Sequence, residues 1–198
     1  MSKPFSQACL NNRQPILDVL LQYFGEVDQV LEIGSGTGQH AVFFAEHMPW
    51  LRWQPSDRAE HLDGIRAWRT EAALPNLAAP LELDVARQPW PLDAVPAIFS
   101  ANTVHIMGWP EVEAFIPAVG ARLPPGGLFC LYGPFNYGGN YTSPSNAQFD
   151  GWLKQRDARS GIRDFEAVDA LADAAGLTLL ADHAMPANNR CLVWRKAG

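Results

Sequence analysis

The chain has 198 residues, of which 47% are hydrophobic, and this is enough material for the core of one domain. A net charge of −6 and the lack of a basic run argue against a nucleic-acid partner. Three widely spaced cysteines predict neither a disulfide framework nor a metal site. Because there is no secretory leader and no apolar run of about 20 residues, we expect a cytoplasmic protein without membrane contact.

The first half of the chain alternates between helical and strand patterns. Residues 15–24 have apolar side chains at helical spacing, and Pro15 suits a first helical turn. A short apolar strand at 29–33 runs into a glycine cluster, and helical character resumes over 40–47. Residues 52–56 predict a second strand with Pro55 near its end, residues 62–73 a helix, and residues 81–85 a third strand.

The second half continues this alternation and then changes it. We expect strands at 94–101 and 127–132, with a helix at 111–123 between them. After a Gly/Asn/Ser-rich stretch at 133–146, helices are expected at 147–159 and 164–175, and strands at 178–183 and 190–195. The last two strands are joined too closely for a parallel crossover, so they must pair antiparallel.

These elements predict one α/β domain over residues 1–198. Its seven-stranded sheet would be mostly parallel, with an antiparallel C-terminal hairpin and helices on both faces.

The strongest functional signal is VLEIGSGTG at 30–38, where a strand leads directly into three alternate glycines. Glycines let the backbone turn tightly and let a ligand approach it closely. A dinucleotide fingerprint would need a glycine where Gln39 stands. Glu32 would repel a pyrophosphate and suits an ammonium group better. The motif therefore indicates a ligand other than a nicotinamide dinucleotide.

This segment resembles motif I of class I S-adenosylmethionine-dependent methyltransferases, whose fold is Rossmann-like. The resemblance implies that S-adenosyl-L-methionine is the cofactor and that Gly34, Gly36 and Gly38 line its methionine part. We include Glu32 and Ser35 in the same cofactor-binding segment.

Further cofactor contacts are expected where the next strands end. Asp57 follows the second strand, 23 residues after Gly34, where a carboxylate can accept both ribose hydroxyls. It could instead be a loop residue or a helix N-cap, and the neighbouring Arg58, also a candidate, could lie at the surface. The same resemblance implies that Asp84 hydrogen-bonds to the adenine amino group and that Val85 supplies a backbone donor.

The acceptor side should lie beyond the fourth and fifth strands, because ligands of open α/β sheets bind outside the carboxyl ends of the strands. Asn102 is expected near the cofactor, and His105 is the candidate general base, although a packed histidine is at least as plausible. The segment from Asn102 to His105 departs from the Asn/Asp-Pro-Pro-aromatic tetrad of enzymes that methylate nucleobase amines.

Other expected acceptor contacts lie in loops and in the N-terminal arm. The glycine-rich loop after the fifth strand carries Asn136, Tyr137 and Tyr141, which would form part of the pocket or its lid, or a simple connector. Asn189, in the hairpin turn, would flank the pocket or merely shape the turn. Residues 1–14 are a possible lid in which Arg13 pairs with a carboxylate, or else a surface arm.

Over nearly its whole length the chain resembles one small family. The segments that carry this resemblance are PFSQACLNNRQPIL, VLEIGSGTGQHAVFFA, SANTVHIMGW and the tail that ends in MPANNR. The family is known as domain of unknown function 938 and includes the methyltransferase-like 26 proteins.

We therefore expect an enzyme, a monomer or homodimer, that methylates an O, N or S nucleophile of a small molecule without a metal. The alternatives are a non-catalytic S-adenosylmethionine-binding module or partner subunit and, less well supported, a nicotinamide-dependent oxidoreductase.

Overall fold

The computed structural model describes residues 3–198. The helices are α1 (Gln7–Tyr23), α2 (Gln39–His47), α3 (Leu62–Ala72), α4 (Trp109–Arg122), α5 (Pro144–Arg156) and α6 (Phe165–Ala174), with short 3-10 helices at Ala59–His61 and Pro186–Asn188. The strands are β1 (Gln29–Ile33), β2 (Arg52–Asp57), β3 (Leu81–Glu82), β4 (Ala97–Ala101), β5 (Leu128–Gly133), β6 (Phe135–Asn136), β7 (Arg163–Asp164), β8 (Leu177–Met185) and β9 (Asn189–Lys196).

Seven strands form one sheet in the order β3-β2-β1-β4-β5-β9-β8. Neighbours from β3 to β5 pair in parallel, whereas β9 is antiparallel to both β5 and β8. The predicted mostly parallel sheet with a C-terminal hairpin is therefore confirmed. The chain moves outward from β1 through β2 to β3 and then returns to the other side of β1 as β4. This reversal places a ligand crevice beyond the ends of β1 and β4.

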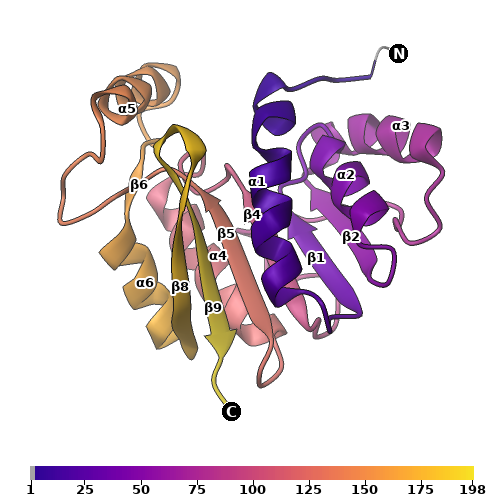
Figure 1. Ribbon diagram of the computed structural model, residues 1–198. Helices are drawn as coiled ribbons and strands as arrows, with labels where there is room; N and C mark the ends of the chain where they lie inside the picture. The colour runs from indigo at the N-terminus through magenta and orange to yellow at the C-terminus, as the bar shows by residue number, and fades with distance from the viewer. Residues whose placement is uncertain (1–2) are drawn as a thin grey trace.

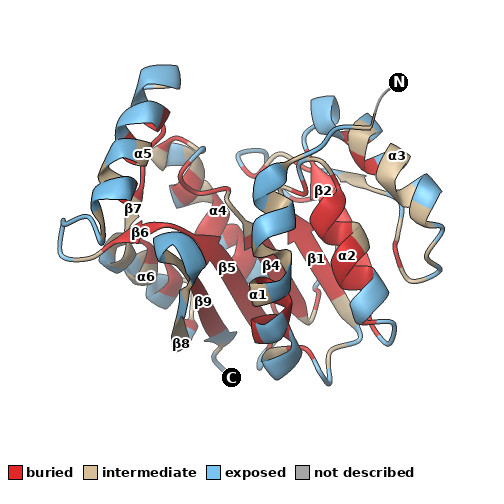
Figure 2. Ribbon diagram, turned by 45° about the horizontal axis from the view of Figure 1, so that its top comes forward, coloured by how far each residue is buried: buried red, intermediate tan, exposed pale blue. Residues whose placement is uncertain are grey.

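Two apolar cores cover the two faces of the sheet. On one face α1 and α2 pack over buried strand residues that include Trp53 and Phe99, and on the other α4 and α6 pack over Phe129 and Trp194. Figure 1 shows α1 and α2 in front of the sheet with α4 behind it, and the carboxyl ends of the parallel strands at the top. In Figure 2 the inner strands are buried, whereas much of α1 and α5 is exposed. The cores fix the strand ends, on which the site depends.

The first helix begins eight residues earlier than predicted, at Gln7, with the Ser6 side chain capping its amino end at the Cys9 amide. Pro15 therefore lies inside the helix and not in its first turn, so the predicted start was wrong. Proline has no amide hydrogen to give to the carbonyl four residues earlier, at Asn11. Asn11 is exposed, so water can satisfy that carbonyl.

Two predicted strands are shorter than expected, and three, β2, β8 and β9, are longer. Strand β3 covers only Leu81–Glu82 instead of 81–85, and β4 begins at Ala97 instead of residue 94. Strand β2 extends to Asp57 and contains Pro55, which pairs with Glu32 of β1. Alternate residues of β2 direct their backbone groups toward β3, and Trp53 bonds to Asn76 and Ala78 on that side. Pro55 faces the same side but lies before β3 begins, so its missing amide hydrogen leaves no strand partner unsatisfied.

The segment after β5 contains structure that the sequence did not predict. Strands β6 and β7 form a separate two-stranded parallel sheet, in which Phe135 pairs with Arg163 and Asn136 with Asp164. Helix α5 spans Pro144–Arg156 rather than 147–159, because Ser143 caps it by accepting a hydrogen bond from the Asn146 amide.

Helix α5 lies at the strand-end edge and is held mainly by polar contacts (Figure 1). Its buried residues are Asn146, Asp150 and Leu153. Asn146 Nδ2 donates to the Asn188 carbonyl at 3.1 Å, and Asp150 Oδ1 accepts from the Ile162 amide at 2.7 Å. Because only one of the three buried side chains is apolar, hydrophobic burial contributes little to the docking of α5.

Within residues 3–198, no helix combines the length and the apolar character that crossing a bilayer would require. The same part of the chain contains no group of three or more His, Cys, Asp or Glu residues placed to hold a metal ion.

Candidate functional site

The glycine loop between β1 and α2 has the backbone that its sequence indicates. Gly34, Gly36 and Gly38 have positive φ angles of 73°, 56° and 91°. A Cβ atom on Gly34 would lie 2.5 Å from Thr103 Cγ2, and one on Gly38 would lie 2.9 Å from Ile65 Cα. A Cβ on Gly36 would meet no described atom within 4 Å. Gly34 and Gly38 thus permit close packing, whereas Gly36 leaves an open backbone face that a ligand can approach.

The amide groups of Gly34, Ser35 and Gly36 in this loop already donate to other parts of the protein. The Gly34 and Ser35 amides both donate to the Ser56 carbonyl at 3.0 Å, and the Gly36 amide donates to Asp57 Oδ2 at 2.7 Å. A phosphate-binding loop directs its free amides at the ligand. The loop therefore suits a ligand that needs little amide donation, which disfavours a pyrophosphate.

Glu32 is buried beneath the loop, with an exposed fraction of 1%. Its Oε2 atom accepts hydrogen bonds from Ser35 Oγ at 2.9 Å and Trp53 Nε1 at 3.0 Å. The pKa of Glu32 is raised from 4.5 to about 7, mainly by burial; the charge of Asp57 contributes to this rise and the two hydrogen bonds oppose it. A cation beside Glu32 would favour its ionised form.

Asp57 ends β2 and faces the loop. Its Oδ2 atom accepts from the Gly36 amide and its Oδ1 atom accepts from the Arg58 amide at 2.8 Å. These two bonds fix the carboxylate and leave lone pairs on both oxygens for ligand hydroxyls. The Arg58 side chain is 61% exposed and pairs with Glu60 at 3.0 Å, so it lies at the surface.

Asp84 and Val85 lie beside Asp57, because the Leu83 amide donates to the Asp57 carbonyl at 2.9 Å. Asp84 Oδ1 accepts from the Ala86 amide at 3.0 Å, and Oδ2 lies 3.5 Å from Arg87 Nε. The carboxylate is 34% exposed, so it remains accessible to a ligand.

Asn102 stands at the end of β4 with a positive φ of 58°. Its amide donates to the Tyr132 carbonyl at 2.8 Å. One residue later, Thr103 Oγ1 lies 2.7 Å from Ser100 Oγ, which itself donates to the Ile33 carbonyl at 2.8 Å. These contacts hold the ends of β1 and β4 together where the strand order reverses.

The N-terminal arm is anchored to α2 rather than free. His40 Nε2 lies 2.7 Å from Asn12 Oδ1, and the Arg13 guanidinium lies 4.5 Å from the centre of the Phe43 ring. Burial lowers the pKa of His40 to about 4. Arg13 thus contacts an aromatic ring, and its role toward a carboxylate stays a prediction. Of the predicted lid, residues 1 and 2 lie outside the described residues.

Three of the predicted acceptor contacts are used inside the protein. The Tyr137 hydroxyl donates to Asp182 Oδ2 and the Tyr141 hydroxyl to Asp150 Oδ2, both at 2.7 Å. Asn189 Nδ2 donates to the Pro186 carbonyl at 3.1 Å, as expected of a residue that shapes the turn. These polar groups serve the local structure here, and their contact with an acceptor remains a prediction.

His105 and Asn136 differ from these three residues. His105 Nδ1 and Asn136 Oδ1 are buried and have no hydrogen-bond partner within residues 3–198. Burial lowers the pKa of His105 to about 4, and the nearby Arg163 charge adds to the effect, so the imidazole is neutral at pH 7. A neutral imidazole can accept a proton.

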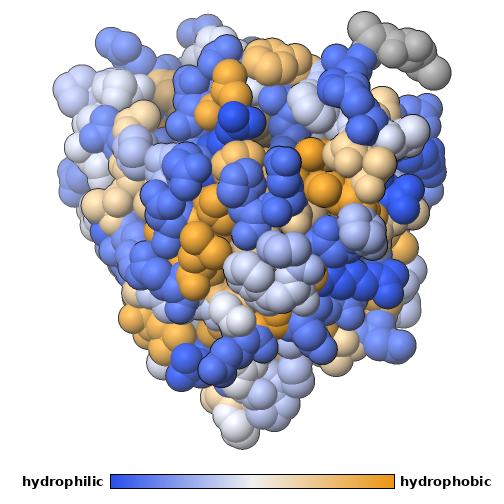
Figure 3. All heavy atoms as spheres, turned by 45° about the vertical axis from the view of Figure 1, so that its right-hand side comes forward, coloured by the Kyte–Doolittle hydropathy of each residue, from blue (hydrophilic) through white to orange (hydrophobic). Residues whose placement is uncertain are grey.

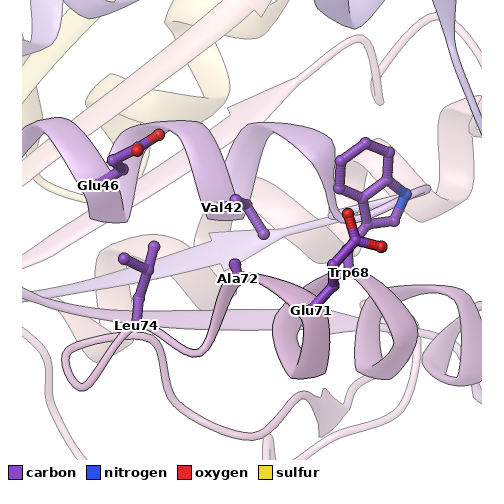
Figure 4. A pocket seen from close by; sticks show the side chains of 6 residues that line it. All are labelled: Val42, Glu46, Trp68, Glu71, Ala72 and Leu74. Carbon is purple, nitrogen blue, oxygen red and sulfur yellow. The ribbon is translucent and has the colours of Figure 1, made fainter.

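Two hollows lie near the glycine loop but on its α3 side. A cleft of about 820 Å³ is lined by Gly36 and Thr37 together with Pro4, the 3-10 helix at Ala59–His61 and α3. Figure 3 brings this side of the molecule forward and shows hydrophobic side chains in small areas among hydrophilic ones. A pocket of about 190 Å³ between α2 and α3 (Figure 4) is lined by none of the predicted site residues. Only the larger cleft reaches the glycine loop.

The donor set fits S-adenosylmethionine. Its ammonium and sulfonium groups are positive, and Glu32 and Asp57 place carboxylates at the glycine loop. The fixed Asp57 carboxylate suits two ribose hydroxyls, and the open face of Gly36 lets the ligand approach the backbone.

The sequence did not indicate the residues that hold this site in place. Trp53 hydrogen-bonds Glu32 from the next strand, and Ser56 accepts two loop amides. Thr103 packs against Gly34. No local pattern reveals such contacts between strands.

Solved structures of methyltransferases share this fold at low sequence identity. The mitomycin 7-O-methyltransferase MmcR matches with a TM-score of 0.84 and 16% identity, over 96% of this chain and 54% of that one. Human N-acetylserotonin methyltransferase in complex with SAM matches with a TM-score of 0.75 and 14% identity, over 94% and 55%. An O-methyltransferase family 2 protein from Planctomyces limnophilus in complex with apigenin matches with a TM-score of 0.81 and 16% identity, over 96% and 58%.

The chain spans little more than half the length of these proteins, and identities this low show the methyltransferase Rossmann-like fold alone. One family of sequences, described as protein of unknown function (DUF938), matches residues 3–196. The match covers nearly the whole sequence, and the chain belongs to the DUF938 family.

Proposed function

We propose that this protein is an S-adenosylmethionine-dependent methyltransferase that acts on an O, N or S nucleophile of a small molecule. The observation that carries the proposal is the open face of Gly36 beside the fixed Asp57 carboxylate and the buried Glu32. S-adenosylmethionine supplies a methyl group on a positively charged sulfur, and the fold supplies mainly proximity and orientation.

The residues of the site would divide this work. Glu32 would attract the ammonium group, and Asp57 would accept the ribose hydroxyls. Asp84, next to Asp57, would read the adenine amino group. Asn102 and His105 follow β4, so they would border the reacting methyl group, with His105 accepting a proton where the acceptor must lose one.

Isothermal titration with S-adenosylhomocysteine tests the cofactor. We expect micromolar binding, about −8 kcal/mol. Asp57→Ala should weaken it about 10- to 100-fold, because bonds to a charged group contribute about 1.5–3 kcal/mol. Asp173→Ala, at an exposed position of α6, is the matched control. Binding of NADH without binding of S-adenosylhomocysteine would refute the proposal, and turnover of a screened acceptor separates an enzyme from a binding module.

A further inference from the structure

Two buried polar atoms remain unused at the acceptor side of the sheet. His105 is 3% exposed and Asn136 is 9% exposed, and no atom of the chain between Lys3 and Gly198 bonds to His105 Nδ1 or Asn136 Oδ1. A buried polar atom without a partner costs free energy, and such atoms need an explanation where they persist. A ligand that bonds to both atoms would provide one.

One short segment brings the two residues into the same region. The Gly161 amide donates to the His105 carbonyl at 2.9 Å, and three residues later Asp164 pairs with Asn136 between β7 and β6. Gly133, at the end of β5, also lies beside His105: a Cβ there would be 3.5 Å from His105 Nδ1. The loop after β4 and the segment after β5 therefore enclose this region together.

The charges around His105 favour an uncharged ligand group. Arg163 is the nearby cation, but its Nε and Nη2 atoms donate to the backbone carbonyls of Val104, Met107 and Arg159. Asp150, on α5, already pairs with Lys154 at 2.6 Å. The unused atoms are an amide oxygen and a nitrogen of a neutral imidazole, so the region provides no dedicated cation for a carboxylate or thiolate.

Aromatic rings form the outer wall of the same region. Phe149 of α5 packs edge-on against His105 with ring centroids 5.4 Å apart, and Trp152 stacks on Phe149 at 5.7 Å. Aromatic faces and edges of this kind suit another planar ring. Phe149 is only partly buried, so one side of its ring is accessible to a ligand.

From this arrangement we propose that His105 and Asn136 form the acceptor subsite, and that it takes the uncharged hydroxyl of a phenol-like ring rather than an ionised carboxylate or thiolate. The inference rests on the proposed function and names its acceptor class. The imidazole accepts the hydroxyl proton as the oxygen forms its bond to the methyl carbon, while the electron pair of the broken carbon–sulfur bond stays on the sulfur. Before the transfer the single hydroxyl hydrogen is shared between two acceptors, Asn136 Oδ1 and His105 Nδ1, and it passes to the imidazole as the methyl group is transferred.

The test follows the ¹⁵N resonances of the His105 ring in the full-length protein saturated with S-adenosylhomocysteine. Phenol, cyclohexanol and benzoate are added separately as probes. We expect phenol to shift the His105 nitrogen signals, cyclohexanol to shift them less and benzoate to leave them unchanged. A larger response to benzoate, an equal response to cyclohexanol, or no response to phenol would overturn the proposal.

Variants of Asn136 provide the second readout. Asn136→Leu should weaken the phenol response about tenfold in apparent affinity, since it removes one hydrogen bond. Asn140→Leu, on the exposed part of the same loop, should not. Asn136→Asp keeps the shape of the side chain and should raise the pKa of His105 if the two groups share a subsite. An unchanged His105 pKa in that variant contradicts the subsite.

Failure of this inference can be told apart from failure of the proposed function. Glu32 and Asp57 follow β1 and β2, so the Asn136 variants should bind S-adenosylhomocysteine as the wild type does. Normal cofactor binding with no phenol response overturns the acceptor subsite alone, whereas loss of cofactor binding in the unmodified protein overturns the proposed function.

Discussion

Replacing Glu32 with glutamine should stabilise the protein and weaken its ligand binding. Burial raises the pKa of this carboxyl from 4.5 to about 7, which means that the fold disfavours its ionised form. One pKa unit corresponds to about 1.4 kcal/mol, so ionised Glu32 destabilises the folded state by about 3 kcal/mol. Glutamine keeps the shape and can accept the same bonds from Ser35 and Trp53.

The sign of the pH dependence follows from the direction of this shift. Between pH 4.5 and about 7 the folded protein holds a proton on Glu32 that the unfolded chain has released. The contribution of Glu32 to the free energy of unfolding is therefore fully present below pH 4.5, decreases as the pH rises to about 7 and is lost above that pH. The advantage of Glu32→Gln over wild type should grow by about 2 to 3 kcal/mol from pH 5 to pH 8.5.

Urea unfolding at these two pH values measures the difference. Glu26→Gln, at an exposed position before β1, is the control and should show no such growth. A difference between Glu32→Gln and wild type that does not change with pH would refute the reasoning. Titration with S-adenosylhomocysteine should show weaker binding by Glu32→Gln, because the ligand's ammonium loses its anionic partner.

Three further predictions follow from the same geometry. At pH 7, binding of S-adenosylhomocysteine should release about half a proton, because the ligand's ammonium group lowers the pKa of Glu32 from about 7. Calorimetry in buffers of different ionisation enthalpy measures the number of protons released, and a value of zero would contradict the prediction. Gly34→Ala should destabilise the protein more than Gly36→Ala, because only at Gly34 does the new Cβ meet an atom at 2.5 Å. Gly36→Ala should cost about 1–2 kcal/mol of stability from its positive φ and should still impair S-adenosylhomocysteine binding. Urea unfolding and calorimetry measure the two effects, and a greater loss of stability in Gly36→Ala would contradict the prediction. Tyr141→Phe should lower stability by about 0.5–1.5 kcal/mol without changing S-adenosylhomocysteine affinity, because its hydroxyl serves Asp150 of α5; reduced affinity would argue against that assignment.

The sequence predicted the sheet well, and its candidate cofactor residues fall at strand ends, because the signals for strands and their ends are local. Apolar strands followed by glycines, or by Asp57 and Asn102, mark strand ends, and the strand ends of a parallel sheet meet at one edge. The pairing of β5 with β9 followed from a connection too short for a crossover.

The missed elements lack a local signal. Residues 7–14 of α1 are mostly polar, and contacts such as that of Asn12 with His40 stabilise that part of the helix. Strands β6 and β7 have two residues each, too few for a period to show. Whether Tyr137 or Asn136 has a free polar group depends on residues distant in sequence, such as Asp182.

The polar anchoring of α5 has a thermal consequence. A helix whose buried side chains are Asn146, Asp150 and Leu153 exposes little apolar surface when it detaches, so its opening should carry a small heat-capacity change. The cores beneath the sheet faces bury many aromatic rings and depend on temperature more strongly. Cooling would therefore weaken the hydrophobic packing of the sheet before it loosens α5. Hydrogen exchange in α5 should report local opening by breakage of its hydrogen bonds, at a free energy well below that of global unfolding.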